Sequence, residues 1–275
     1  MGVIKIYVYF YKKSKFMPLE EMYEPIMCGN FRYADEFNMI GDDTGENISE
    51  RNFHFSELSG IYWVWKNTKQ DIVGSCHYRR FFTLAEKASD NPILRVYYYL
   101  SGIFKNKKSL IYSNNLDFWK DKILSEPQLR QLLNQYDGVL PKPRRFNKTV
   151  KQQYAKIHNI QDLSIIEDIL KIKHPEYLEA FHTLLDRNTL YANNMFILKN
   201  PYYEQFMEWW FDMLFEFETR IDIQNYKGYQ QRIFGFIAER LLNVWIIKND
   251  LNIIELNVVY FKNLKFEHKI PGDFS

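Results

Sequence analysis

The sequence predicts an α/β protein in which helices flank a mixed, mainly parallel central sheet and a helical part follows. Residues 4–11, IKIYVYFY, are rich in β-branched and aromatic residues and predict an opening strand. Residues 56–67 show a helical spacing of apolar side chains, and a buried strand follows from residue 71. A strand, a helix and a buried strand in succession are the order expected of an α/β fold.

Local signals define the elements around this start. Residues 41–52, GDDTGENISERN, are rich in turn formers and predict a long ordered loop, after which Ser56 is the expected N-cap of the first long helix. Ser125 and Pro127 predict the start of a second helix, and Pro175 predicts a break between two more. The remaining elements are a helix over 125–136, a strand over 137–143, two helices within 158–185, a strand over 193–200, helices over 201–221 and 228–247, and a strand over 252–261.

No internal repeat, low-complexity tract or linker interrupts the chain, so we expect one domain over residues 1–275. The formal net charge of +2 excludes the strong field of a nucleic-acid-binding protein. Aromatic residues make up 17% of the chain, which fits either an aromatic core or a sugar-binding cleft. Without a signal-peptide pattern or 18 consecutive apolar residues, we expect a cytoplasmic protein with free Cys28 and Cys76.

The buried strand DIVGSC ends in a cationic cluster formed by His77, Tyr78, Arg79 and Arg80. Adjacent guanidinium groups repel each other, and their planar forks of donors suit phosphate oxygens. The cluster therefore predicts a phosphate or diphosphate clamp. Surface arginines with carboxylate partners inside the protein are the alternative.

Other polar groups lie at the ends of expected elements, where open α/β sheets bind ligands. An acidic and amide group suits ribose or sugar hydroxyls, or forms a solvated turn: Asp42, Asp43, Glu46, Asn47, Glu57 and Lys66. A basic segment is an anion-binding or membrane-surface patch, or a solvated loop: Lys142, Arg144, Arg145, Lys148 and Lys151.

Three further residues, Asn193, Asn194 and Met195, lead into a strand. Arg232 and Glu239 are seven residues apart and share one helix face, which suits a general base or a structural ion pair. Phosphate-loop, dinucleotide, nucleophile-elbow and zinc motifs are absent from the sequence.

Three motifs together carry a family resemblance: E-L-x-G-x-Y-W-x-W-K-N, G-x-x-H-Y-R-R-F-F and G-F-I-A-E-R-L. In this order they resemble a bacterial family of capsular and exopolysaccharide glycosyltransferases, long catalogued as a domain of unknown function. Some of its members look like galactofuranosyltransferases. The resemblance, over residues 4–260, implies a GT-A-like fold and a nucleotide-diphosphate sugar donor, with UDP expected.

In GT-A enzymes an Asp-x-Asp motif, which holds a divalent metal against the diphosphate, usually ends the corresponding strand. This chain has no Asp-x-Asp and places His-Tyr-Arg-Arg there. Charge that builds on a departing diphosphate must still be stabilised, and two guanidinium groups can do so. We therefore expect no required cofactor, with Mn or Mg held by Asp42 or Asp43 as the alternative.

The resemblance also implies roles for the remaining candidates. Four residues are expected at the donor nucleotide or sugar: Asp43, Asn47, Glu57 and Lys66. Four more are expected in the acceptor or sugar pocket: Asn193, Asn194, Met195 and Arg232. Glu239 is the first candidate for the base that deprotonates the acceptor, followed by Asp137 and then Asp162.

Residues 92–115 depart from the family as an insertion that is apolar, aromatic and basic at once. The expected acceptor is a lipid-linked saccharide at the inner face of the plasma membrane. Arg95, Lys105, Lys107 and Lys108 can rest on anionic lipid there, or the segment packs as a helical hairpin on the domain or on a second subunit. We thus expect a hexosyltransferase of capsule or exopolysaccharide synthesis that moves a sugar, with galactofuranose expected, from the nucleotide-diphosphate donor to this acceptor. A non-catalytic carbohydrate-binding or scaffold component is the alternative.

Overall fold

A computed structural model describes residues 2–12, 16–18, 20–32, 39–86, 92–93, 96–97, 100 and 109–261. Nine of the described strands form one sheet, and β8 and β9 form a separate two-stranded sheet. The strands are β1 (Ile4–Phe10), β2 (Tyr23–Met27), β3 (Ile40–Gly41), β4 (Ile72–His77), β5 (Arg80–Thr83), β6 (Leu110–Ser113), β7 (Gly138–Pro141), β8 (Arg144–Arg145), β9 (Thr189–Leu190), β10 (Phe196–Lys199) and β11 (Ile253–Phe261).

The large sheet divides at the end of β4. Strand β4 runs parallel to β1 and antiparallel to β10, but it meets β5 only where His77 pairs with Arg80. The long strand β11 joins the two parts, because its first half pairs with β7 and its second half with β5 and β6. The tight turn from His77 to Arg80 therefore lies where the sheet splits, beside the carboxyl end of β1.

The sheet is mixed, as the sequence predicts. Strands β1, β2, β3 and β4 pair in parallel, whereas β10 runs antiparallel to both β4 and β7, and β5 runs antiparallel to β11. The α/β class is therefore confirmed. The expectation of a mainly parallel sheet is not, because antiparallel pairs occupy its middle.

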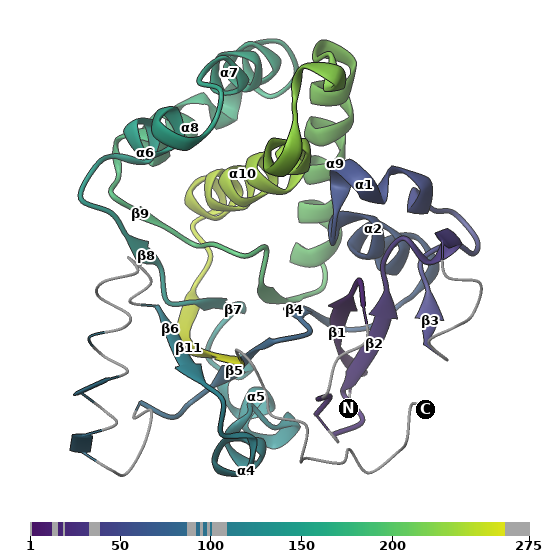
Figure 1. Ribbon diagram of the computed structural model, residues 1–275, viewed down its shortest axis with the longest axis vertical. Helices are drawn as coiled ribbons and strands as arrows, with labels where there is room; N and C mark the ends of the chain where they lie inside the picture. The colour runs from purple at the N-terminus through teal and green to yellow at the C-terminus, as the bar shows by residue number, and fades with distance from the viewer. Residues whose placement is uncertain are drawn as a thin grey trace.

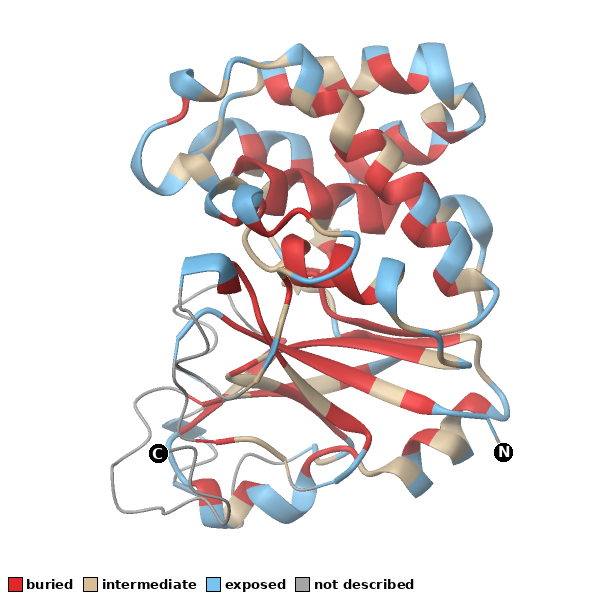
Figure 2. Ribbon diagram, turned by 90° about the vertical axis from the view of Figure 1, so that its right-hand side faces the viewer, coloured by how far each residue is buried: buried red, intermediate tan, exposed pale blue. Residues whose placement is uncertain are grey.

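Helices cover both faces of the sheet (Figure 1). Helices α6 to α10 gather on one side, α4 and α5 lie on the other, and Figure 2 shows the buried strands between these layers. The helices are α1 (Asn52–Phe55), α2 (Leu58–Asn67), α4 (Leu116–Trp119), α5 (Glu126–Leu133), α6 (Val150–Ile157), α7 (Gln161–Lys173), α8 (Leu178–Asp186), α9 (Tyr202–Arg220) and α10 (Ile233–Asn249).

Strand β1 shows how the sequence fills the two cores. Its side chains alternate between the faces, so Tyr7 and Tyr9 join the core beneath α9 and α10, while Ile6 and Val8 join the core beneath α4 and α5. Much of the aromatic content is buried in these cores, with Trp119, Trp210 and Trp245 at most 1% exposed.

Most of the predicted element boundaries are confirmed. Ser125 and Gln128 form a capping box at the start of α5, and the chain breaks at Pro175 between α7 and α8. The prediction for Ser56 is wrong. It separates α1 from α2 with a positive φ of 54°, and its hydroxyl accepts a hydrogen bond from Arg232 instead of capping a helix.

Both cysteines are free, as predicted, and the structure shows that both are buried. The expected membrane or hairpin role of the segment 92–115 falls largely outside the described residues, and so do Arg95, Lys105, Lys107 and Lys108. Strand β6, at the end of that segment, pairs with β11. Among the described helices, none is both long and apolar enough to cross a membrane.

Candidate active site

A cavity of about 320 Å³ opens where the sheet splits, between the turn after β4 and the first half of α10. We call it the arginine cavity, because five of the described residues that line it are arginines and only Glu57 and Glu239 are carboxylates. Its charged and imidazole-bearing residues are Glu57, His77, Arg79, Arg80, Arg144, His158, Arg232, Glu239 and Arg240.

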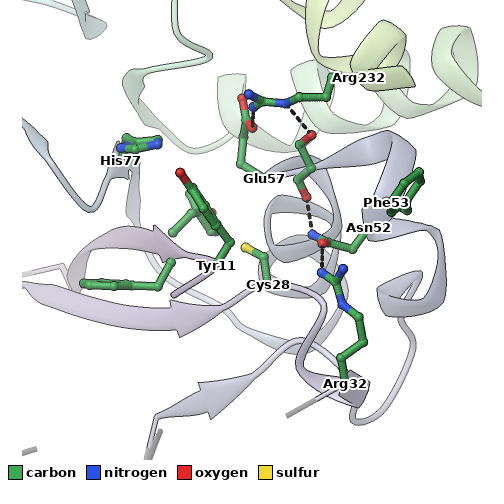
Figure 3. Close-up of a pocket in the computed structure, with 11 residues that line it drawn as sticks. Tyr11, Cys28, Arg32, Asn52, Phe53, Glu57, His77 and Arg232 are labelled. Carbon is green, nitrogen blue, oxygen red and sulfur yellow. Dashed lines mark hydrogen bonds and ion pairs between the residues drawn. The ribbon is translucent and has the colours of Figure 1, made fainter. Parts of the chain in front are cut away.

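A second cavity of about 300 Å³ adjoins the first at the carboxyl end of β1, and we call it the β1 cavity. Its lining includes Tyr9, Cys28 and Asn52. Four residues border both cavities: Tyr11, Glu57, His77 and Arg232. Figure 3 shows Arg232 and Glu57 facing each other, with His77 and Tyr11 nearby. The two cavities are therefore adjacent and share these four lining residues.

Arg79 and Arg80 are half-buried cations without a carboxylate partner in the described part of the chain. Each guanidinium instead lies over an aromatic ring: Arg79 is 4.8 Å from the centroid of Tyr78, and Arg80 is 5.0 Å from that of Tyr260. The Nε atoms of both are buried without a hydrogen-bond partner. Burial, then the nearby Arg144, lowers the pKa of Arg80. A bound anion would stabilise such cations strongly, because it supplies the charge partner and the hydrogen-bond acceptors that they lack.

His77 is positioned to donate a hydrogen bond to an anion. Its Nδ1 lies 3.3 Å from the backbone nitrogen of Arg79, which donates to it, so the ring proton belongs on Nε2. Burial, followed by the charges of Arg80, Arg79 and Arg232, holds the pKa of His77 well below 6.5. The imidazole is therefore neutral near pH 7 and still offers one N–H.

The side chain of Glu239 is held in place by two contacts. The backbone N–H of Asn193 donates to its Oε1 at 2.7 Å, and Arg240 pairs with its Oε2 at 3.2 Å. Arg240 is itself buried. Burial lowers its pKa, and the charge of Glu239 offsets part of that shift. Both contacts fix the position of the Glu239 side chain, and a carboxylate is a group that can act as a general base.

A turn built from two asparagines fixes both carboxylates. Asn193 and Asn194 have φ of 76° and 49°, a left-handed conformation that asparagine tolerates better than most residues. Asn193 donates its backbone N–H to Glu239, while the side chain of Asn194 donates to Glu57 Oε1 at 2.9 Å. Arg144 in turn donates to Asn193 Oδ1 at 2.5 Å.

The structure brings together seven of the predicted site residues. All seven line the arginine cavity: Glu57, His77, Arg79, Arg80, Asn193, Arg232 and Glu239. Buried Asn194 supports that cavity through its hydrogen bond to Glu57.

The other predicted site residues lie elsewhere. Tyr78 points into the core and donates to the hydroxyl of Tyr11, and Met195 is fully buried. Asp43 and Asn47 line a separate pocket beside Ser49, and Lys66 pairs with Glu46.

The two alternative bases are also directed away from the cavity. Asp137 accepts the backbone N–H of Asn252 at 3.1 Å. Asp162 is fully buried and accepts hydrogen bonds from the hydroxyls of Tyr154 and Tyr226 at 2.7 and 2.5 Å. Of the three carboxylates nominated from the sequence, Glu239 alone lines the cavity.

Asp42 has a structural role in the loop, and its environment does not suit a metal ion. It is fully buried and accepts four hydrogen bonds, from the backbone N–H groups of Gly29 and Asn30 and from the hydroxyls of Ser49 and Ser59. No group of three or more potential ligand side chains occurs among the described residues. The cationic turn after β4 likewise does not fit a divalent cation, because its guanidinium groups would repel one.

Sequence reasoning did not place several of the lining residues in the site, among them Arg144, Arg240 and His158. Arg144 was assigned to a basic segment that also suits a solvated loop, yet it reaches Asn193. Arg240 lies in the motif G-F-I-A-E-R-L but was not nominated. His158 follows α6 and had no motif to mark it. An arginine beside a candidate base was the one signal that could have found Arg240.

The split α/β sheet that carries the arginine cavity is similar in fold to a known glycosyltransferase. The chain belongs to the family described as "Domain of unknown function (DUF4422)", whose profile matches residues 5–250. Its structure is similar to the apo structure of the WbbM bifunctional glycosyltransferase, with a TM-score of 0.81 and 30% sequence identity. That match covers 94% of this chain but 45% of the WbbM chain, so this chain spans less than half of that protein. No curated protein matches the chain.

Proposed function

We propose that this chain is a glycosyltransferase that uses a nucleotide-diphosphate sugar as donor. The observation that carries the proposal is the pair Arg79 and Arg80, which lack carboxylate partners in the described structure and lie in one cavity with Glu239. The similarity to WbbM, a glycosyltransferase, supports the same reaction class. A GT-A-like arrangement agrees with the position of both cavities at the carboxyl ends of β1 and β4.

The donor is proposed to span both cavities. The diphosphate binds Arg79, Arg80 and Arg144, with an added hydrogen bond from His77 Nε2. The nucleoside, uridine in our proposal, extends into the β1 cavity past Glu57 and Arg232. We propose galactofuranose as the sugar on the basis of the family resemblance.

The reaction needs one proton acceptor and one stabilised leaving group. An acceptor hydroxyl oxygen bonds to the anomeric carbon of the donor while the bond from that carbon to the diphosphate oxygen breaks. The electron pair of the broken bond leaves with the diphosphate, where the arginines offset the added charge. The hydroxyl proton passes to the Glu239 carboxylate, which Asn193 and Arg240 hold in place.

Metal independence is part of the proposal. Three guanidinium groups without carboxylate partners in the described structure supply positive charge at the position where a metal would otherwise act. Turnover that persists in EDTA and does not rise with added Mn²⁺ is the expected result. Activity that disappears with EDTA and returns with Mn²⁺ would contradict this part alone.

Nucleotide binding tests the proposal as a whole. Thermal shift with UDP, GDP, ADP and a panel of UDP-sugars should show stabilisation by the UDP compounds. UDP release, measured with and without saccharide acceptors, then distinguishes transfer to an acceptor from hydrolysis of the donor. Stabilisation by none of these nucleotides would favour a non-catalytic carbohydrate-binding or scaffold component of capsule assembly instead.

A lipid-linked saccharide of capsule or exopolysaccharide synthesis is the proposed acceptor. The apolar and basic composition of residues 92–115 supports contact with an anionic membrane surface. Co-sedimentation with liposomes that contain phosphatidylglycerol should exceed that with phosphatidylcholine liposomes. Equal recovery with both would remove membrane contact from the proposal.

A further inference from the structure

One side of the arginine cavity is aromatic. His158, Tyr229 and Phe236 all line the cavity, and we call them the aromatic face. The rings of His158 and Phe236 have centroids 4.2 Å apart, and those of Tyr229 and Phe236 are 5.1 Å apart. They come from three segments: the end of α6, the turn before α10, and α10 itself.

The exposure of this face separates it from the aromatic core. Tyr229 is 66% exposed, although its ring contacts that of Phe236 at a tilt of 44°, and Phe236 is only half-buried. Covering apolar rings that face water at a cavity wall is favourable, because a ligand that packs on them removes apolar surface from water. The C–H faces of a sugar ring are such a ligand, because they pack on aromatic rings while the hydroxyls point outward.

The hydrogen bonds of Gln230 fix the proton of His158. Gln230 Nε2 donates to the carbonyl of Ile157 at 2.8 Å, so its amide oxygen is the atom that lies 2.8 Å from His158 Nδ1. Nδ1 therefore carries the proton and donates it. Nε2 then keeps a lone pair, for which the described residues provide no partner, and it can accept from a hydroxyl in the cavity that the ring lines.

The base lies one helical turn from the same face. Phe236 and Glu239 are three residues apart on α10 and both line the cavity. Side chains at this spacing lie on one side of a helix, about 5–6 Å apart at their Cβ atoms. A sugar ring that covers Phe236 can therefore present a hydroxyl to Glu239 without leaving the aromatic surface.

We propose that the aromatic face is the subsite for the acceptor saccharide. The terminal sugar packs on Tyr229 and Phe236, and one of its hydroxyls donates to His158 Nε2, which orients the neighbouring hydroxyl toward Glu239. This assignment rests on the proposed transferase function but makes its own claim, since it places a neutral sugar on residues other than the proposed diphosphate ligands.

A binding experiment tests the subsite without requiring turnover. Saturation-transfer NMR with methyl glycosides of galactose, glucose and mannose, each at about 10 mM to reach millimolar Kd values, should show transfer to at least one glycoside in the presence of UDP. The signal should fall at least about fivefold in Tyr229→Ala. Phe31→Ala removes another exposed ring outside both cavities and should leave the signal unchanged. Equal signals in wild type and Tyr229→Ala, or no signal with any glycoside, would overturn the assignment.

Kinetics separate the two claims. With an active donor, Phe236→Leu and His158→Ala should raise the acceptor KM about tenfold, and His158→Gln should recover most of that loss because its amide oxygen can accept the same hydrogen bond. Thermal stabilisation by UDP should be the same in all three variants. An unchanged acceptor KM in His158→Ala and Phe236→Leu would refute the subsite, whereas absence of UDP stabilisation in the wild-type protein would refute the proposed function.

Discussion

His77 and His158 line the same cavity with their protons on opposite ring nitrogens. Nδ1 of His77 accepts the backbone N–H of Arg79, whereas Nδ1 of His158 donates to Gln230. Burial lowers the pKa of both, so both rings are neutral near pH 7. His77 can thus donate a hydrogen bond to an anion, while His158 can accept one from a hydroxyl. The proposed sugar-nucleotide and the proposed saccharide acceptor need these two kinds of hydrogen bond.

Replacement of Arg80 by glutamine should weaken UDP binding about 10- to 100-fold. The reason is that a charge-assisted hydrogen bond to a buried phosphate contributes about 1.5–3 kcal/mol. Isothermal titration calorimetry with UDP measures the change. Arg145→Gln removes the same charge from an exposed position on β8 and should change Kd less than about twofold. Equal losses in the two variants would mean that general charge, and not the clamp, determines affinity.

Glu239→Gln should lower kcat at least about 100-fold while UDP affinity changes little, because an amide cannot take the acceptor proton. Steady-state rates of UDP release with acceptor present provide the measurement. Asp137→Asn is the matched control, since Asp137 was also a candidate base but bonds to Asn252 outside the cavity. Near-normal turnover in Glu239→Gln would remove Glu239 from the mechanism.

Asp42→Asn should destabilise the fold by about 2–4 kcal/mol, because an amide turns one of two acceptor oxygens into a donor that faces existing donors. Asp43→Asn, which disturbs one hydrogen bond from Asn30, should cost less than about 1 kcal/mol. Urea unfolding followed by circular dichroism compares the two. If Asp42→Asn kept wild-type stability and instead lost Mn²⁺-dependent activity, Asp42 would be a metal ligand.

Stability should fall as the pH drops below 6.5, because of His77. Folding depresses its pKa, so below 6.5 the unfolded chain binds a proton that the folded protein does not. Each such histidine destabilises the fold by up to about 1.4 kcal/mol per pH unit in this range. Urea unfolding at about pH 7.5 and about pH 5.5 should show a smaller pH dependence in His77→Asn than in wild type. Identical pH dependence in both proteins would show that His77 titrates normally.

Local chemistry determined what the sequence could predict. The capping box at Ser125 and the break at Pro175 depend on residues within one turn, so they can be recognised without tertiary contacts. The role of Ser56 depends on Arg232, a distant residue, and the prediction of an N-cap failed for that reason.

The site shows the same division. The cluster from His77 to Arg80 was visible as a run of adjacent residues. That Arg79 and Arg80 pair with no carboxylate among the described residues depends on tertiary structure and could not be read from the sequence. Asp162 illustrates the converse: its two tyrosine partners lie 8 and 64 residues away, so nothing local marked it as a buried structural acid.

Strand β11 has a consequence for how this site comes into being during protein synthesis. It supplies the ring of Tyr260 beneath Arg80, and it is the partner of β5, β6 and β7, which all precede it by long stretches of chain. A nascent chain that lacks β11 leaves the edges of those three strands unpaired and open to association with other chains. The ribosome must therefore release residues 253–261 before the ring of Tyr260 can pack against Arg80, and a pause just upstream would extend the period in which those strand edges are exposed.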